Sequence, residues 1–327
     1  MNHCPVCASP RTGSGAGCPG CGFSLAFAEA FSSPEARAQW EAEVARRVQQ
    51  HRAQSVSGRT ALTVLERQIA CAENGSVRRF SAAGDAQIIA NAVQISQSRT
   101  HELILMENGR VKAGGSNRMG QCMVQDIRNA AFVLAGPNVS YIVTREGRVL
   151  ARGVCAFAEE IAGWRDIETL ACGDQFLAGL TKSGRMYLAA APGAPFRING
   201  PWEDIRSIAA ADDYLIALAN SGIIRIAGRR DDEACLRAME WRNVVAVAAE
   251  DMYAVGLTRD GRVLLAGEGG WLDRGRSKAA EWTNITAIAA GHGAIAAVDA
   301  NGRLHIAGDN FATLAGRERL IAQWTHG

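Results

Sequence analysis

Four cysteines near the start of the chain have the residue type and spacing of a metal site. They form two C-x-x-C pairs, Cys4 with Cys7 and Cys18 with Cys21, and ten residues separate the pairs. Each pair holds two thiolates on one turn, and two such pairs complete the tetrahedral ligand set of structural Zn²⁺. We therefore predict a zinc site within residues 1–33. So short a segment cannot bury a large core, and we expect the metal to supply its folding free energy.

The segment that carries these cysteines resembles a zinc ribbon. Two disulfides are the alternative, but no secretory signal is recognisable, so we expect a reducing cytoplasmic location in which thiolates bind metal. Arg11 and Glu29 are the fully charged side chains of residues 1–33, and phosphate binding needs several Lys or Arg, so we expect no nucleic-acid binding. Its aromatic and apolar side chains would form a small core or dock on a partner; they are Phe23, Leu25, Phe27 and Phe31.

Residues 34–59 are predicted to form a linker helix. Ser33 suits the N-cap and Pro34 the first helical position, and an Ala-, Glu-, Arg- and Gln-rich run follows. Its apolar stripe is narrow and consists of Trp40, Val44 and Val48. We expect this stripe to pack on the next domain or to pair with the same helix of a second copy.

Seven glycines divide the rest of the chain into similar units. They recur at intervals of 34 to 41 residues, at Gly75, Gly109, Gly147, Gly184, Gly222, Gly261 and Gly302. Short apolar runs flank each glycine, and a third run precedes them, so each unit predicts a β-hairpin plus at least one further strand. Such a period marks a repeat fold, and four-stranded blades around a central axis are its common closed form. The sequence therefore predicts an all-β chain with a seven-bladed propeller over residues 60–327.

Tryptophans give a second marker of the same repeat. Trp164, Trp202, Trp241 and Trp282 each stand 20 residues before their glycine. The first unit lacks an equivalent, whereas Trp324 follows the last glycine. We expect the end of the chain to pack against the first blade and close the ring.

Three stretches resemble repeats of the regulator of chromosome condensation family. They are the segment Gly115 to Cys122, the run Trp282 to Ala290, and the phrase Asp-Gly-Arg-Val. The likeness covers about residues 60–327 and implies a seven-bladed propeller of the type found in bacterial members. It also implies two alternative activities, nucleotide exchange on a small GTPase and inhibition of a partner enzyme.

One repeat position suggests a protein-binding surface. Eight residues before each glycine, three successive units carry Phe176, Tyr214 and Tyr253, and the second unit carries His101, where the family has a recurrent histidine. Carboxylates stand beside these aromatics, at Asp174, Asp212, Asp213, Glu250 and Asp251. Aromatic anchors ringed by polar groups are typical of protein-binding hot spots. The alternative is that the aromatics cover blade ends and the aspartates cap their own turns.

Composition favours a non-catalytic scaffold. The formal net charge is +2, and no apolar run is long enough to span a membrane. The six histidines are scattered, and no H-E-x-x-H, G-x-S-x-G or phosphate-loop motif occurs, so we expect no enzyme activity and no small-molecule substrate. Cys71 and Cys172 occupy positions at which other units carry apolar residues, and we expect them to be buried. We assign no chemistry to Cys122, Cys155 and Cys235.

Overall fold

The computed structural model describes residues 62–65, 68–73, 76–81, 86–194, 196, 198, 201–228, 236–250, 253–267, 273, 275–291 and 293–308. All of them belong to a compact unit that spans residues 58–327. The predicted zinc ribbon with Cys4, Cys7, Cys18 and Cys21, the predicted linker helix and Trp324 lie outside the described residues.

The described residues form seven antiparallel sheets. The first sheet has four strands, β1 (Leu62–Leu65), β2 (Gln68–Glu73), β3 (Ser76–Ser81) and β4 (Ala86–Ala90). The next three sheets contain β5 (Ala92–Gln97), β6 (His101–Met106) and β7 (Val111–Gly115); β8 (Ala130–Gly136), β9 (Val139–Thr144) and β10 (Val149–Gly153); and β11 (Ile167–Cys172), β12 (Phe176–Thr181) and β13 (Met186–Ala190). The last three contain β14 (Ile205–Ala210), β15 (Tyr214–Ala219) and β16 (Ile224–Gly228); β17 (Val244–Glu250), β18 (Tyr253–Thr258) and β19 (Val263–Gly267); and β20 (Ile285–Gly291), β21 (Ala294–Asp299) and β22 (Leu304–Gly308).

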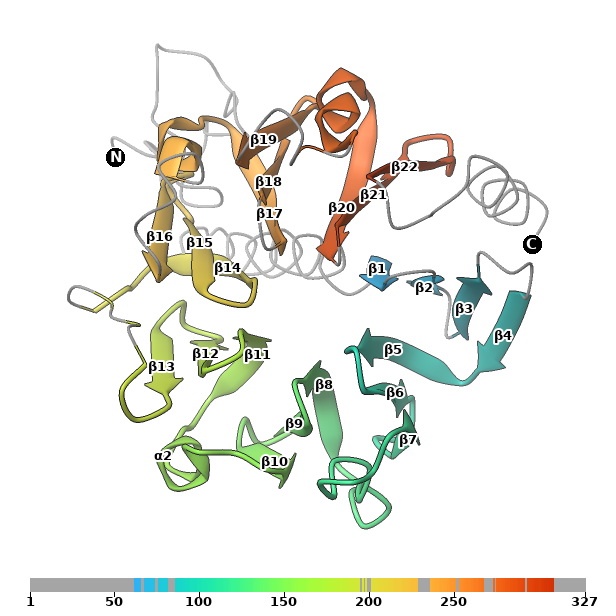
Figure 1. Cartoon of the computed structure of the whole chain (residues 1–327), viewed down its shortest axis with the longest axis vertical. Coiled ribbons are helices and arrows are strands. Elements are labelled where there is room, and N and C mark those ends of the chain that lie inside the picture. Colours follow the sequence, from blue (N-terminus) through green and yellow to red (C-terminus); the bar gives the residue numbers. More distant parts are fainter. Residues whose placement is uncertain are drawn as a thin grey trace, which may run out of the picture. The chain divides into compact units, whose positions relative to one another are not determined.

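These sheets are set around a common centre, with the first strand of each sheet nearest to it (Figure 1). The prediction of an all-β fold is confirmed, and the seven sheets agree with the seven predicted blades. Among the described residues, a fourth strand occurs in the first sheet alone. Three connectors between later sheets instead contain short helices, α2 (Ala158–Ala162), η1 (Arg237–Glu240) and η3 (Arg276–Glu281).

The repeated glycines stand at the predicted hairpins, and their role extends beyond the turn. The six described ones all have positive φ, between 73° and 86°. In four units the glycine carbonyl accepts a hydrogen bond from the first residue of the next sheet, as Gly147 does from Ile167 at 3.0 Å. A Cβ atom at Gly147 would lie 2.7 Å from Asp166 Cα. Glycine therefore provides both the turn and a close contact between neighbouring sheets.

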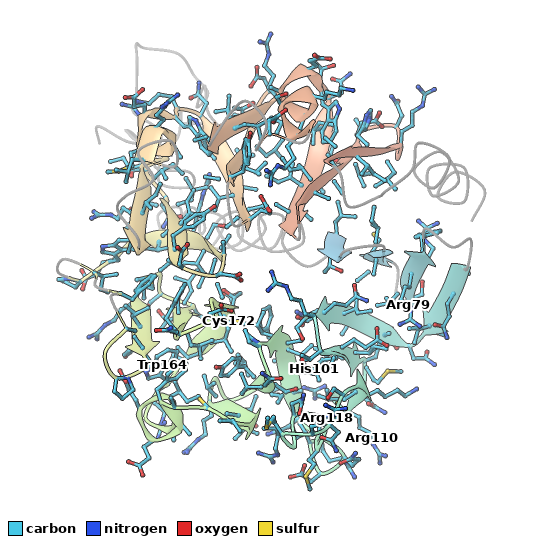
Figure 2. All side chains as sticks on the ribbon, viewed as in Figure 1. Arg79, His101, Arg110, Arg118, Trp164 and Cys172 are labelled. Carbon is cyan, nitrogen blue, oxygen red and sulfur yellow. The ribbon has the colours of Figure 1, made fainter. Side chains whose placement is uncertain are left out.

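Tryptophans fill the space beside the middle strands. Trp164, labelled in Figure 2, is 4% exposed, and a Cβ atom at Gly179 would lie 2.7 Å from its indole ring. Trp241 and Gly256 repeat this relationship at the same distance. The mid-strand glycine therefore leaves room for the indole, which explains why the two residue types recur together.

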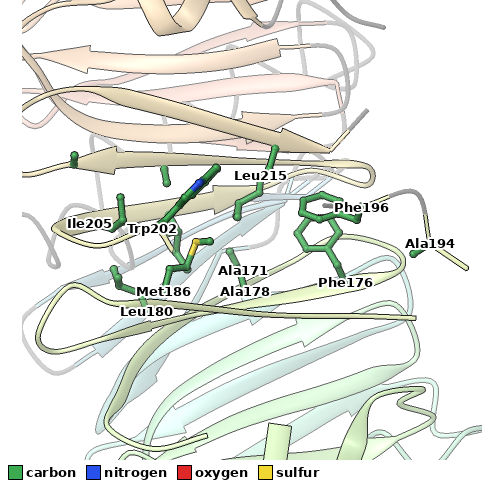
Figure 3. Close-up of a cluster of buried hydrophobic side chains, with 14 residues drawn as sticks. Ala171, Phe176, Ala178, Leu180, Met186, Ala194, Phe196, Trp202, Ile205 and Leu215 are labelled. Carbon is green, nitrogen blue, oxygen red and sulfur yellow. The ribbon is translucent and has the colours of Figure 1, made fainter. Parts of the chain in front are cut away.

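The hydrophobic core consists of clusters between adjacent sheets. One cluster joins β11–β13 to β14–β16 and contains Phe176, Trp202 and Leu215 (Figure 3). Another joins the first sheet to the last, because Leu62 and Phe80 pack with Ile306 and its neighbours. The ring therefore closes by packing of the first sheet against the last sheet.

Candidate functional site

The loops between the first and second strands lie at one end of the sheets. We call this end the first-loop rim, and its described loops are residues 98–100, 137–138, 173–175 and 211–213. The connector after β7 starts at the same end, since a Cβ atom at Gly115 would lie 2.8 Å from His101 Cα. The glycine turns lie at the opposite end, which we call the hairpin rim.

The three predicted aromatic residues are the first residues of β12, β15 and β18, and all three are buried. Phe176 is 1% exposed, and its ring stacks on Phe196 with 3.9 Å between ring centroids (Figure 3). Tyr214 Oη donates hydrogen bonds to the carbonyl oxygens of Glu250 at 3.0 Å and Tyr253 at 2.6 Å. This burial supports the alternative in which the aromatics cover the ends of the sheets. They hold the neighbouring loops in place and offer no ring to a partner.

A buried ion pair ties the sixth sheet to the connector that follows it. Arg276 Nη1 lies 2.5 Å from Glu250 Oε2, and the two side chains are 2% and 4% exposed. Glu250 Oε1 also accepts a hydrogen bond from the Gly293 backbone at 2.9 Å. The carboxylate of Glu250 therefore stabilises the rim from inside, because a buried charge requires such compensation.

Tyr253 extends this network towards the surface. The Arg276 guanidinium lies 4.4 Å from the centroid of the Tyr253 ring, and Tyr253 Oη donates to Asp273 Oδ1 at 2.9 Å. Burial, together with the hydrogen bond to Asp273, raises the pKa of Tyr253 to about 12. Burial tends to raise the pKa of Asp273, but hydrogen bonds from Ser277 and Tyr253 hold it below its usual value. At neutral pH the pair is a phenol that donates to a carboxylate.

His101 lies within a buried chain of hydrogen bonds (Figure 2). Ser140 Oγ donates to the Gln121 carbonyl at 2.7 Å, so His101 Nε2 donates to Ser140 Oγ at 2.8 Å. His101 Nδ1 lies 3.1 Å from the hydroxyls of Ser98 and Thr100. Burial lowers the pKa of His101, which favours the neutral ring. Ser140 is fully buried, so the pair joins β6 to β9 and is closed to substrates.

Three of the predicted carboxylates meet on the first-loop rim. Asp174 and Asp213 are exposed, and the side chain of Asp212 is 43% exposed. The Asp174 backbone N–H donates to the Asp212 carbonyl at 2.8 Å, which fixes the two loops against each other. Gly173 makes this approach possible, since a Cβ atom there would lie 2.6 Å from the Ala211 carbonyl oxygen. Asp251 lies outside the described residues.

The sequence interpretation missed Arg99. Its Nη2 lies 3.6 Å from Asp212 Oδ2, and its side chain is 57% exposed. Arg99 belongs to the loop before β6 and Asp212 to the loop before β15, so no local pattern indicates their contact. Within the described loops, the rim therefore carries exposed carboxylates, and Arg99 lies beside one of them, Asp212.

The described part of the chain contains no metal-binding cluster, and its cysteines are all buried or half-buried. There, no three His, Cys, Asp or Glu residues gather in a way that could hold a metal ion. Cys71 is buried as predicted, whereas Cys172 is only half-buried; desolvation of its thiol still raises the pKa of Cys172 to about 12. No helix within the described ranges is long and apolar enough to cross a membrane.

Comparisons with known proteins identify the fold. No family model matches the chain, and no curated protein matches it. Among solved structures it is similar to yeast RCC1 (Prp20) bound to Kap60, with 16% identity, a TM-score of 0.57, and coverage of 80% of this chain and 83% of that chain. A structure of Prp20p from Saccharomyces cerevisiae, described with its binding to Gsp1p and histones, gives the same identity and TM-score and is covered over 85% of its length. The CRINKLY WD40 ectodomain of the Arabidopsis thaliana receptor kinase ACR4 follows with 13% identity, a TM-score of 0.53, and coverage of 76% and 95%. At these identities the likeness shows the fold, which is a β-propeller similar to that of RCC1.

Proposed function

We propose that the chain is a non-catalytic protein-binding scaffold whose first-loop rim holds a protein partner. The observation that carries this proposal is the backbone hydrogen bond between Asp174 and Asp212, which keeps carboxylates of two adjacent sheets together on the rim. The buried bonds of Tyr214, Glu250 and Tyr253 tie the ends of β15, β17 and β18 to one another and to the connector that contains η3. A surface that is already ordered loses little conformational entropy when a partner binds.

The chemistry of the rim favours a basic segment of the partner. Asp174, Asp212 and Asp213 would present carboxylates to such a segment, and complementary charge directs both specificity and association rate. Similar propellers support a protein partner: yeast RCC1 is described bound to Kap60, and Prp20p is described with binding to Gsp1p and histones. We propose a cytoplasmic location and neither a small-molecule substrate nor a nucleic-acid ligand.

Cys4, Cys7, Cys18 and Cys21 are proposed to bind one structural Zn²⁺, on the basis of their sequence spacing. The zinc-bound segment would act as a structural or docking module for the scaffold. Metal analysis of the purified full chain should give one zinc per chain. Replacing Cys18 and Cys21 by Ser should abolish it, and retained zinc in that variant would contradict the assignment.

The test of partner binding compares two matched sets of charge removals. One variant carries Asp174→Asn, Asp212→Asn and Asp213→Asn on the first-loop rim, and its control carries Glu107→Gln, Glu146→Gln and Asp260→Asn on the hairpin rim. All six residues lie at least partly exposed on loops or turns, and circular dichroism checks that both variants fold. Affinity capture from the native cells should lose the partner with the first variant and keep it with the control. Equal capture by both would contradict the proposal.

Nucleotide exchange on a small GTPase is a second candidate. The observation that favours it is the similarity of fold to Prp20p, a protein studied for its binding to Gsp1p. If the captured partner is a GTPase, its rate of nucleotide release with and without this chain separates an exchange factor from a scaffold. An unchanged rate supports the scaffold.

A further inference from the structure

Exposed apolar side chains gather at one place beside the first-loop rim. Among the described residues, seven large hydrophobic side chains are well exposed, and three of them are Met119 (51%), Met123 (59%) and Val154 (65%). We call these three the methionine patch. The other four lie on other elements and are Ile88, Val93, Ile223 and Met239.

The segments that carry these three residues meet at one buried residue, Gln121. A Cβ atom at Gly120, next to Met119, would lie 3.7 Å from Met123 Sδ. Gly153, which precedes Val154, packs against Gln121, with 3.2 Å between its Cβ position and Gln121 Cβ. Gln121 is fully buried, so its chain neighbours and Gly153 cover it and bring the backbone of Met119, Met123 and Val154 to the same part of the surface.

Hydrogen bonds and buried side chains order the loop that carries the two methionines. The Cys122 N–H donates to Asn117 Oδ1 at 2.8 Å, and the Met119 N–H donates to Gln121 Oε1 at 2.9 Å. The Gln121 carbonyl accepts the hydrogen bond of Ser140 described above. Buried Cys122 and Val124 anchor the far side of the loop. Two methionine side chains are therefore exposed to solvent on an ordered backbone. Polar side chains would fit at both positions, so packing does not require methionine there.

Charged groups beside the patch indicate what it would bind. Arg118 is exposed next to Met119 (Figure 2). Arg152 donates to the Met123 carbonyl at 3.1 Å and pairs with Asp126 at 2.8 Å, so it lies at the edge of the patch. Two cations against one carboxylate leave a positive border around an apolar centre.

We propose that the methionine patch binds an apolar side chain of a protein segment that carries Asp or Glu beside it. Methionine suits this role because its unbranched, polarisable side chain adapts to the shape of an apolar partner. The inference rests on the proposed function, since a contact patch has a role only in a protein that binds a partner. The segment that the methionine patch would bind differs from the one proposed for the first-loop rim, because the carboxylates of the rim favour a basic segment.

The test uses random peptides displayed on phage and selected against the full chain. Binding of the selected peptides is then measured for wild type, for Met119→Glu/Met123→Glu, and for Met239→Glu as the matched control on an exposed methionine elsewhere. We expect peptides with an apolar residue beside Asp or Glu, which lose about tenfold or more in affinity with the double variant and none with the control. Arg118→Ala should weaken the same peptides at low salt.

Three other outcomes would contradict the proposal that the methionine patch binds such a segment. Peptides that bind the double variant and wild type equally, or that are weakened as much by Met239→Glu, overturn it. If such peptides also lose affinity for the Asp174, Asp212 and Asp213 variant, the proposed function stands without the patch. A selection that yields no peptide above background contradicts both. Thermal unfolding checks that the double variant folds, and Met119→Ala/Met123→Ala replaces it if the charges disturb the loop.

Discussion

Arg99 and Asp212 approach to 3.6 Å although their sheets are not neighbours in the ring. Arg99 belongs to the second sheet and Asp212 to the fifth, so two sheets separate them on one side and three on the other. Loops from opposite sides therefore meet at the first-loop rim. This contact places the exposed carboxylates beside the middle of the rim, where a single partner segment can reach loops of several sheets.

Replacing Arg99 by Ala should change binding more than stability. The pair is exposed, so its loss should alter the free energy of unfolding by less than about 1 kcal/mol. The rim becomes more negative, and a basic partner segment should associate faster at low salt, with the gain shrinking as salt is added. Urea unfolding and stopped-flow binding measure the two effects. Slower association of the variant would contradict this account of the rim.

Tyr214→Phe should destabilise the chain by about 1–3 kcal/mol, because two buried carbonyl oxygens lose their shared donor. Tyr187→Phe is the control, since its hydroxyl makes no hydrogen bond to the rest of the described chain while its ring stacks on Trp164. The control should unfold at nearly the wild-type urea concentration. Equal losses in the two variants would show that ring packing matters and the hydroxyl of Tyr214 does not.

Arg276→Met should cost about 3–5 kcal/mol, because it leaves the Glu250 carboxylate buried without its cation. Arg262→Met removes a guanidinium from an exposed pair with Asp260 and should cost less than about 1 kcal/mol. Urea unfolding of both variants makes the comparison. A loss below about 1 kcal/mol for Arg276→Met would mean that Glu250 finds other compensation.

His101 should make stability depend on pH. Burial lowers its pKa from the ordinary 6.5, so below that pH the unfolded chain binds a proton that the folded chain resists. The contribution of His101 is present above about pH 6.5 and falls by up to about 1.4 kcal/mol per pH unit as pH drops towards the folded pKa.

His101→Gln measures this contribution. The variant should lose less stability than wild type between about pH 7.5 and about pH 5.5, as followed by urea unfolding. The hydroxyls of Ser98, Thr100 and Ser140 that face the ring are uncharged and do not offset protonation. Parallel pH curves for wild type and variant would exclude His101 as a source of the dependence.

The sequence predicted the sheets because the signals are local. Each hairpin is encoded by Asn-Gly, Asp-Gly or Ser-Gly between apolar runs, or by a close variant, and the turn needs no information from other units. The sequence interpretation did not predict the positive φ of the Asp or Asn directly before the first strand of five sheets, at Asn91, Asp166, Asp204, Asn243 and Asn284. Asx residues tolerate this conformation, and in four units the Asx residue stands two positions after the marker tryptophan, a repeat signal that the sequence interpretation did not use.

The candidate site was harder to predict. An aromatic residue at the start of a strand gives the same sequence pattern whether its ring is exposed for a partner or buried at the end of the sheet. Phe176 is buried because Phe196, in a later connector, stacks on it. Arg99 and the methionine patch were missed for a related reason. Arg99 contacts a residue of a distant sheet, and the exposure of Met119 and Met123 follows from the folded path of the connector after β7.

Hydrogen exchange of the full chain with its captured partner tests the central claim most directly. If the first-loop rim holds the partner, amide exchange should slow in the loops of residues 98–100, 173–175 and 211–213 and stay unchanged in the hairpin turns of residues 107–109, 145–147 and 259–261. Slowed exchange confined to the hairpin turns would contradict the account.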